Sequence, residues 1–375
     1  MPKKPGILMV GWGWPPKMDG GLDTHVHNLT LNLSAKDDMQ IDLFLPKINM
    51  PKTIPKGNLK IHPVNIRMQC NTIDSLIATV KRYNRNISKT AQKPDIIHVH
   101  DWLGIDAGIA LKDRFKIPLV LTVHSLEYMR SADESSNSED IIDNIEKKGM
   151  AEADIIIAVS DFMKREIIKK YNINENKIKV IPNGPTFKNS GKPSKKEKDL
   201  IVYCGRLTGQ KGVEYLLLAA KEVLKKNKKA KFVIIGKGYL EKQLKDLAYL
   251  LGIDGSVKFI GFTETKEIQK YYMKAEAVVF PSVFEPFGIT ILDALSCGAP
   301  VITTENAGIA ENLKDRKHLL KVRERDSKDL AEALISLLDN PSLRKTLSEN
   351  GKKASEKYSW KNIASRTRDI YMNLL

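Results

Sequence analysis

Cysteine is scarce in this chain, and the positions of the cysteines indicate neither disulfide bridges nor a metal site. Three cysteines occur among 375 residues, namely Cys70, Cys204 and Cys297. They are widely separated and lack the spacing of metal ligands, which argues against a disulfide framework and a zinc site. No apolar stretch approaches the roughly 20 residues that a membrane-spanning helix needs. These shortages favour a reducing compartment and a soluble protein.

The N-terminal residues also lack the pattern of a secretory signal. They pass directly into a short apolar run from Ile7 to Val10. That run is too short for the apolar region of a signal peptide. We therefore expect a cytoplasmic protein, at most peripheral to a membrane.

The charge balance is strongly basic. Lys and Arg number 61 against 45 Asp and Glu, which gives a formal net charge of +16. A basic field attracts polyanions, but much of the lysine falls in segments such as 221–229, where a solvated helix face explains it. No nucleic-acid motif and no interleaving of aromatic with basic residues occurs. We expect no nucleic-acid partner, while peripheral contact with an anionic membrane stays open.

The length of the chain favours two domains with separate cores, because 375 residues exceed the usual size of one compact α/β domain. The apolar fraction of 42% and the charged fraction of 28% are typical of soluble globular proteins and exclude disordered and collagen-like classes. Small ligands often bind in clefts between domains. A ligand site in an interdomain cleft is therefore expected.

Short apolar runs alternate with amphipathic segments in both halves of the chain. The runs predict buried strands and the segments predict helices, in the β-α-β rhythm of a parallel sheet. Strands are expected at 7–10, 41–45, 59–64, 95–100, 118–124, 154–160 and 178–182, then at 200–206, 231–236, 257–262, 277–281 and 300–304. Helices are expected at 24–35, 72–89, 105–114, 161–171, 212–226, 240–251, 266–274 and 289–296. The fold class predicted is α/β, with two Rossmann-like domains.

The rhythm breaks between residues 183 and 198, where Pro, Gly, Ser and a run of lysines have the composition of an exposed linker. We therefore place one domain at 1–185 and a second at 198–357. A last helix follows in 358–375, because Ser359 is a plausible N-cap and apolar residues recur at helical spacing.

The first candidate site is the glycine-rich segment 11–22, between the first strand and a helix that Asp23 or Thr24 could cap. Adjacent glycines let backbone amides approach a phosphate, and a helix N-terminus favours negative charge. Glycines directly after a strand often serve only a tight turn, an explanation that fits the first two of the segment. Gly20 and Gly21 are the better candidates.

The second candidate site is the segment 205–212, at the end of the second domain's first strand. Arg206 and Lys211 would place two cations at the carboxyl edge of a sheet, where open α/β folds bind ligands. Their position on either side of a strand-to-helix turn favours anion binding over a solvated surface.

The third candidate site is the segment 284–300. Glu285 precedes a helix and Asp293 lies within it, so two carboxylates can accept hydrogen bonds from the hydroxyl groups of one ligand. Between them Gly288, Ile289 and Thr290 would offer N-terminal amides to an anion.

The fourth candidate site combines two strands that end in polar residues. His100, Asp101 and His124 fall at strand ends and are expected to face one crevice. His98 lies inside its strand and is interpreted as structural.

An Asp-x-Asp pair is absent from the sequence. This absence argues mildly against a carboxylate pair that chelates a divalent metal. A bound diphosphate can be stabilised instead by positive side chains and helix N-termini, which the segments above supply.

Together the four segments resemble the GT-B retaining glycosyltransferases, in particular the family that includes the glycogen and starch synthases, within the glycosyl transferases group 1 superfamily. The resemblance covers nearly the whole chain. Lys17 with Gly20-Gly21-Leu22 is similar to the family's Lys-x-Gly-Gly-Leu loop, and His100-Asp101-Trp102 to its His-Asp-Trp. Gly205-Arg206-Leu207 and Gln210-Lys211-Gly212 are similar to its Gly-Arg-Leu and Gln-Lys-Gly.

The resemblance implies a retaining hexosyltransferase that needs neither metal nor cofactor. Its donor would be a nucleotide diphosphate sugar, with ADP-glucose or UDP-glucose favoured, and its acceptor a glycan bound by the N-terminal domain. The loop glycines, Arg206 and Lys211 would contact the diphosphate, and His124 the transferred sugar. The resemblance also implies that the last helix crosses back onto the N-terminal domain.

Two positions depart from the family pattern. The family has two glutamates, the first contacting the sugar and the second the ribose, which correspond here to Glu285 and the shorter Asp293. One extra residue separates Lys17 from the glycines, which weakens the role of that lysine at the diphosphate.

Three other functions are compatible with the sequence. A glycosyltransferase of lipid-linked or cell-surface glycan synthesis would use the basic surface to dock on a membrane. A nucleotide-sugar epimerase would release isomerised sugar without an acceptor. A basic nucleotide-sensing or nucleic-acid-binding module would bind polyanions in a salt-sensitive way and turn over no donor.

Overall fold

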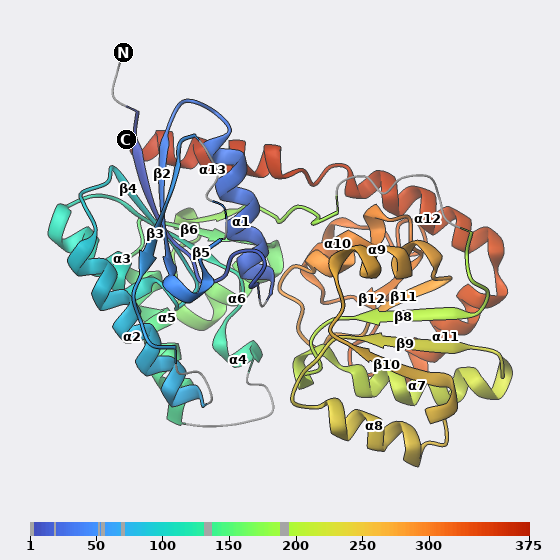
Figure 1. Ribbon diagram of the computed structural model, residues 1–375. Coiled ribbons are helices and arrows are strands. Elements are labelled where there is room, and N and C mark those ends of the chain that lie inside the picture. The colour runs from blue at the N-terminus through green and yellow to red at the C-terminus, as the bar shows by residue number, and fades with distance from the viewer. Residues whose placement is uncertain are drawn as a thin grey trace. The chain divides into compact units, whose positions relative to one another are not determined.

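The computed structural model describes residues 4–18, 20–51, 53, 57–68, 72–130, 137–187 and 195–375 (Figure 1). Cys70 and residues 188–194 of the expected linker lie outside the described residues. The chain forms two compact units. Unit 1 comprises Met1–Gly184 together with Ser359–Leu375, and unit 2 comprises Pro185–Tyr358. Among the described residues, no helix is both long and apolar enough to cross a membrane.

Unit 1 is built on a parallel sheet of seven strands, in the order β3-β2-β1-β4-β5-β6-β7. The strands are β1 (Gly6–Val10), β2 (Gln40–Pro46), β3 (Leu59–Val64), β4 (Ile96–His100), β5 (Leu119–Val123), β6 (Ile155–Ala158) and β7 (Ile178–Val180). The helices are α1 (Gly21–Ser34), α2 (Ile73–Thr90), α3 (Ile105–Phe115), α4 (Glu127–Arg130), α5 (Asn137–Glu152), α6 (Asp161–Tyr171) and α13 (Trp360–Leu374). The helices α1 and α13 pack together, whereas α2, α3 and α5 pack with one another.

Unit 2 repeats this architecture with a parallel sheet of six strands, in the order β10-β9-β8-β11-β12-β13. The strands are β8 (Leu200–Cys204), β9 (Lys231–Ile235), β10 (Val257–Gly261), β11 (Ala277–Phe280), β12 (Val301–Thr304) and β13 (Leu320–Val322). The helices are α7 (Val213–Lys226), α8 (Glu241–Leu250), α9 (Thr265–Lys274), α10 (Ile289–Ser296), α11 (Ser327–Asp339) and α12 (Pro341–Ser355). Both units are therefore Rossmann-like, as the alternation of apolar runs predicted.

Both sheets reverse their strand order at one point, where ligands of open α/β folds bind beyond the carboxyl ends of the strands. In unit 1 the reversal lies between β1 and β4, which pair directly. In unit 2 it lies between β8 and β11, which also pair directly. The segments that follow these four strands include the first three candidate sites and part of the fourth, whose His124 follows β5.

The start of α1 differs from the expectation. The helix begins at Gly21 after an N-cap at Gly20 without a side-chain cap, so neither Asp23 nor Thr24 caps it. Asp23 instead lies in the first turn, and its Oδ1 accepts a hydrogen bond of 2.7 Å from the amide of Gly13. A carboxylate inside the first turn still complements the positive end of the helix.

The last helix, α13, belongs to unit 1. Its N-cap is Ser359, whose side chain accepts a hydrogen bond from the amide of Asn362, as the sequence predicted. The hydroxyl of Tyr371 lies 2.5 Å from His98 Nδ1, and the other ring nitrogen of His98 lies 2.7 Å from Thr122 Oγ1. His98 therefore links the central strands to the C-terminal helix, which agrees with its structural interpretation.

Replacing Tyr371 by Phe should destabilise unit 1 by about 1–3 kcal/mol, because His98 Nδ1 would stay buried without a partner. Chemical denaturation of the variant measures the change. Tyr249→Phe is the matched control, since that ring is 74% exposed on unit 2. Equal stability of the two variants would show that His98 does not need the hydroxyl.

Candidate functional site

A partly buried ion pair lies at the strand reversal of unit 2. Lys211 Nζ donates a hydrogen bond of 2.7 Å to Glu285 Oε2, and Ser282 Oγ donates one of 3.3 Å to the same oxygen. Lys211 ends the short 3-10 turn after β8, and Glu285 follows β11. The structure therefore brings together two candidates that lie 74 residues apart in the sequence. Arg206, which also follows β8, is exposed.

The loop that carries Glu285 is held by the segment after β12. The amide of Gly308 donates a hydrogen bond of 2.8 Å to the Glu285 carbonyl, and the amide of Ile309 donates one of 2.8 Å to the Phe287 carbonyl. These backbone bonds fix the loop against its neighbour. The position of the Glu285 carboxylate is thus set by the sheet edge and does not depend on a free loop.

The N-terminus of α10 lies directly after this loop. Gly288 is its N-cap, with φ of 101°, a conformation that favours glycine, and no side chain caps the helix. The amides of Ile289 and Thr290 fall in the first turn, where the helix itself provides no acceptor. Such amides and the helix dipole can bind an anion.

A second uncapped helix starts near Lys211. Gly212 is the N-cap of α7, with φ of 61°, and no side chain caps this helix either. A Cβ at this position would lie 2.2 Å from the carbonyl oxygen of Pro281. Only glycine therefore lets the chain turn here, which places Lys211 beside the end of β11.

Asp293 lies inside α10 and is 5% exposed. Its Oδ1 accepts hydrogen bonds from the amides of Thr186, at 2.5 Å, and Phe187, at 3.3 Å. Burial raises the pKa of this carboxyl to about 7, although the two amide donors oppose the rise. The carboxylate therefore anchors the start of unit 2.

The glycine-rich loop of unit 1 divides into two parts. A Cβ at Gly11 would meet the side chains of Leu45 and Val26 at 2.9 and 3.1 Å, and one at Gly13 would meet the Asp23 carboxylate. These two glycines are required by packing.

The part of the loop nearer α1 is more open. A Cβ at Gly20 would meet no atom within 4 Å, and Gly21 starts α1. Lys17 points elsewhere, since its Nζ donates a hydrogen bond of 2.9 Å to the Ile48 carbonyl. Of the predicted residues in this loop, Gly20 and Gly21 are therefore at the helix N-terminus, whereas Lys17 is held on a different segment.

The fourth candidate site lies at the ends of β4 and β5. His100 Nδ1 is 3.2 Å from His124 Nε2, and Asp101 Oδ1 accepts hydrogen bonds from the amides of His124, at 2.6 Å, and Ser125, at 3.4 Å. Asp101 has φ of 49° and is 7% exposed. Burial lowers the pKa of His124 to about 3, so its imidazole is neutral at pH 7. Asp101 thus fixes the backbone of His124.

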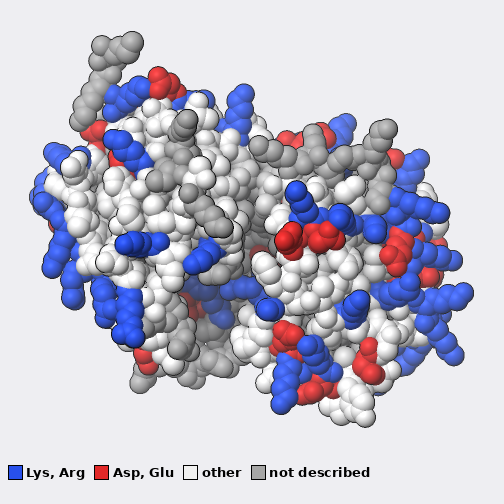
Figure 2. Space-filling view, in the orientation of Figure 1, with Lys and Arg blue, Asp and Glu red and all other residues white. Residues whose placement is uncertain are grey.

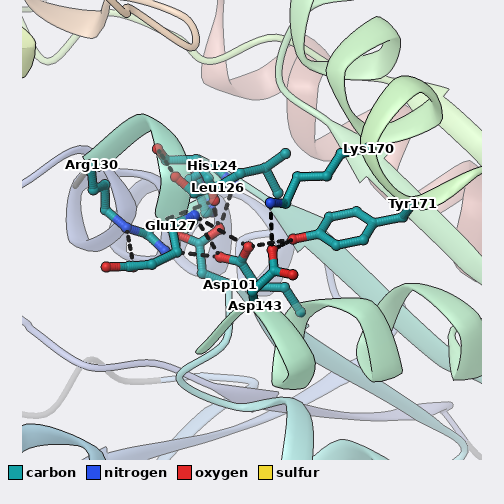
Figure 3. A network of polar contacts seen from close by, with 10 residues as sticks. Asp101, His124, Leu126, Glu127, Arg130, Asp143, Lys170 and Tyr171 are labelled. Atoms are coloured by element: carbon teal, nitrogen blue, oxygen red, sulfur yellow. Dashed lines mark hydrogen bonds and ion pairs between the residues drawn. The ribbon is translucent and has the colours of Figure 1, made fainter. Parts of the chain in front are cut away.

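A network around Arg130 supports this carboxylate (Figure 3). The guanidinium lies 2.9 Å from Glu127, 2.9 Å from Glu146 and 3.6 Å from Asp101. Burial opposes the charge of Arg130, but these three carboxylates outweigh burial and raise its pKa. One cation therefore balances a cluster of buried acids next to His124.

The network extends to α6 through Tyr171, whose hydroxyl oxygen lies 2.8 Å from Asp143 Oδ1 and 2.9 Å from Glu146 Oε2, so that it donates to one of them at a time. Lys170 pairs with Asp143 at 2.7 Å (Figure 3). Burial raises the pKa of Glu146 to about 7, while Arg130 acts in the opposite direction. The sequence analysis missed this network, because no local spacing links residues on α4, α5 and α6.

A third imidazole completes the polar end of this sheet. His25, on α1, lies with its ring centroid 4.6 Å from that of His124 and 5.4 Å from that of His100. Its Nδ1 is 2.6 Å from Asn183 Oδ1. The sequence analysis counted His25 only as part of a helix. The single available signal was its place one turn beyond the glycines.

The two sheet edges have different chemistry. Unit 2 offers cations and helix N-termini, which suit an anion such as a diphosphate. Unit 1 offers neutral imidazoles and a backbone fixed by a carboxylate, which suit hydroxyl groups.

Both halves of the chain match known glycosyltransferase families. Residues 186–354 match Glycosyl transferases group 1, and residues 19–185 match Glycosyltransferase Family 4. An uncharacterized glycosyltransferase of Methanocaldococcus jannaschii is 31% identical, over 97% of this chain and 97% of its own length. The glycogen synthase of Mycobacterium tuberculosis is 26% identical, over 98% of this chain and 94% of its own length.

Solved structures agree on the fold. Sucrose-phosphate synthase from Thermosynechococcus elongatus superposes with a TM-score of 0.82 at 22% identity, covering 99% of both chains. Anabaena HepE in complex with UDP-glucose superposes with a TM-score of 0.75 at 17% identity, covering 99% of this chain and all of the other. With the M. jannaschii relative matched over 97% of both chains, the chain belongs to the glycosyl transferases group 1 family and has the GT-B fold.

Proposed function

We propose that this glycosyltransferase moves a glucosyl group from ADP-glucose or UDP-glucose to a glycan acceptor, with retention of configuration and without a metal ion or cofactor. The observation that carries the proposal is the Lys211–Glu285 pair beside the uncapped N-terminus of α10, at the strand reversal of unit 2. A cation and free amides at this point match the charge of a diphosphate.

The diphosphate must accept negative charge as the sugar leaves. Arg206 and Lys211 supply positive charge, and the amides of Gly288, Ile289 and Thr290 supply hydrogen bonds at the positive end of α10. Gly20 and Gly21 offer a second helix N-terminus in unit 1. These fixed groups take the place that a divalent cation has in other transferases.

The reaction then needs no side-chain nucleophile. The bond between the anomeric carbon and the diphosphate oxygen breaks while the acceptor hydroxyl oxygen bonds to the same face of that carbon. The acceptor proton passes to the departing diphosphate oxygen. Electrostatic stabilisation of the diphosphate is accordingly the largest contribution to the rate.

The sugar itself would be held by Glu285 and His124. The Glu285 carboxylate has one oxygen engaged by Lys211 and Ser282, and carboxylate oxygens accept several hydrogen bonds. His124 is a neutral donor or acceptor whose backbone is fixed by Asp101. For Asp293 we keep the ribose contact as a proposal, alongside its bonds to Thr186 and Phe187.

Glucose and a glycan acceptor are supported by similarity to proteins with stated activities. The glycogen synthase of M. tuberculosis matches 98% of this chain. Anabaena HepE, similar in fold, was crystallised with UDP-glucose. The motifs shared with the synthases favour the same donor class.

A thermal-shift panel of ADP-, UDP- and GDP-sugars tests the donor, because a ligand that binds only the folded state raises the melting temperature. We expect one glucose donor to stabilise the chain in EDTA, and that donor to yield a free nucleoside diphosphate when a glucan is added. Stabilisation by no donor, or release of an isomerised free sugar without an acceptor, would contradict the proposal.

A membrane-linked acceptor is the second candidate, because the net charge is +16. On the face seen in Figure 2, however, Lys and Arg are scattered and Asp and Glu lie among them. Sedimentation with anionic liposomes separates the two candidates. Co-sedimentation that salt abolishes would favour the membrane acceptor.

A further inference from the structure

Three imidazoles at the carboxyl end of the unit 1 sheet form a cluster with the dimensions of a metal site. His25 comes from α1, His100 ends β4 and His124 follows β5. One ring nitrogen of each lies within 4.8 Å of the other two. This is the single group of three or more His, Cys, Asp or Glu with such spacing in the part of the chain that the structure describes.

His25 is oriented as a metal ligand would be. Its Nδ1 lies 2.6 Å from Asn183 Oδ1, an oxygen that can only accept, so Nδ1 carries the proton and Nε2 carries a lone pair. That Nε2 is buried and has no hydrogen-bond partner among the described residues. A carbonyl oxygen that holds the distal nitrogen in this way is typical of metal-bound histidine.

The other two imidazoles are already spaced as ligands. His100 Nδ1 and His124 Nε2 are 3.2 Å apart. Two nitrogens bound at about 2.05 Å to one tetrahedral Zn²⁺ are about 3.4 Å apart. His100 Nε2 is likewise buried without a hydrogen-bond partner among the described residues.

The donor set of this cluster consists of three imidazole nitrogens. Neutral imidazoles suit Zn²⁺ and similar transition metals, whereas Mg²⁺ and Ca²⁺ prefer oxygen ligands. Asp101, whose Oδ1 accepts from the His124 amide, adds a nearby carboxylate to balance the charge.

We propose that His25, His100 and His124 bind one Zn²⁺ ion and that this ion inhibits the enzyme. The binding is independent of the proposed function. The inhibition rests on it, because an ion that engages His124 removes the imidazole from the transferred sugar. Water can reach the ion as a fourth ligand from the side of His124, which is half-buried. His25 and His100 are each 1% exposed, so water does not reach the ion past them.

Isothermal titration of Zn²⁺ into the metal-stripped full chain tests the binding. We expect one Zn²⁺ per chain, an affinity at least tenfold lower in His25→Asn, and no comparable site for Mg²⁺. Asparagine can keep the donor toward Asn183 while it removes Nε2. His27→Asn, on the same helix, is the matched control, since His27 packs edge-on against Trp14 outside the cluster.

A second measurement covers the case that His25→Asn fails to fold. The visible spectrum of the wild-type chain with Co²⁺ should show the intense bands of a tetrahedral nitrogen site, which Zn²⁺ displaces. Equal Zn²⁺ affinity in His25→Asn and His27→Asn would overturn the site, as would a spectrum of hydrated Co²⁺.

The inhibition is tested separately by donor turnover with and without Zn²⁺. We expect loss of turnover in stoichiometric Zn²⁺ and recovery in EDTA, with His25→Asn resistant. Zn²⁺ bound at this site without loss of turnover would overturn the inhibitory role. If the chain binds Zn²⁺ but turns over no donor even in EDTA, the proposed function is contradicted, whereas the proposed metal site is not.

Discussion

Replacing Lys211 by Ala should lower kcat/KM for donor turnover by roughly 30- to 1000-fold, which corresponds to about 2–4 kcal/mol of transition-state stabilisation. The ammonium group lies at the strand reversal of unit 2, where it pairs with Glu285. Its removal takes away a fixed positive charge and leaves the Glu285 carboxylate buried without that partner. Steady-state kinetics with the donor identified by the thermal-shift panel provide the measurement.

The effect should be specific to this position. Arg206→Ala should lower kcat/KM to a similar degree, because Arg206 follows the same strand. Lys225→Ala is the matched control, since Lys225 is exposed on α7 and pairs with Glu222. Unchanged turnover in both Lys211→Ala and Arg206→Ala would remove these residues from the mechanism.

Replacing Arg130 by Met should destabilise unit 1 by about 3–5 kcal/mol, the usual result of removing one partner from a buried ion pair. The guanidinium is the cation shared by Asp101, Glu127 and Glu146. Without it these carboxylates stay buried near one another and repel. Chemical denaturation at pH 7 measures the loss, with Arg323→Met as control, because the Arg323 side chain is 68% exposed and its ion pairs should contribute little.

The destabilisation by Arg130→Met should grow with pH. In the unfolded chain Glu146 titrates near 4.5, and burial raises its pKa to about 7 in the folded protein. Loss of Arg130 would raise the folded value further. A raised folded pKa gives stability that is present below the unfolded value and lost as pH rises through the folded value. The variant should therefore keep losing stability above pH 7, and an equal loss at pH 5 and pH 8 would contradict this explanation.

The sequence predicts the sheets well because their central strands are buried on both faces. All twelve expected strands are present, since runs such as those of β1 and β8 are almost wholly apolar and are each followed by a glycine. The strand that was missed, β13, is followed directly by the charged residues 323–326, whereas the equally short β7 continues into the apolar Ile181. Of the later helices, α11 and α12 follow β13 and were also not identified.

Local patterns place the candidate residues at strand ends, but they do not give the partners. The sequence places Lys211 at the carboxyl edge of a sheet and Glu285 before a helix, and the structure adds the strand order and the ion pair between them. Arg130, Glu127 and Glu146 were not identified from the sequence, because contacts among separate helices leave no periodicity. His25 likewise could not be identified from the sequence, because its neighbours His100 and His124 lie at the end of β4 and directly after β5, far from α1 in the chain.

The most direct measurement of the central claim is the affinity of a nucleoside diphosphate with and without divalent metal. UDP, ADP and GDP are titrated into the metal-stripped chain in EDTA and again in Mg²⁺. Fixed charge at Arg206 and Lys211 predicts the same Kd for the preferred nucleotide in both buffers, and weaker binding by Lys211→Ala. Binding that appears only with Mg²⁺, or that Lys211→Ala leaves unchanged, would contradict the account.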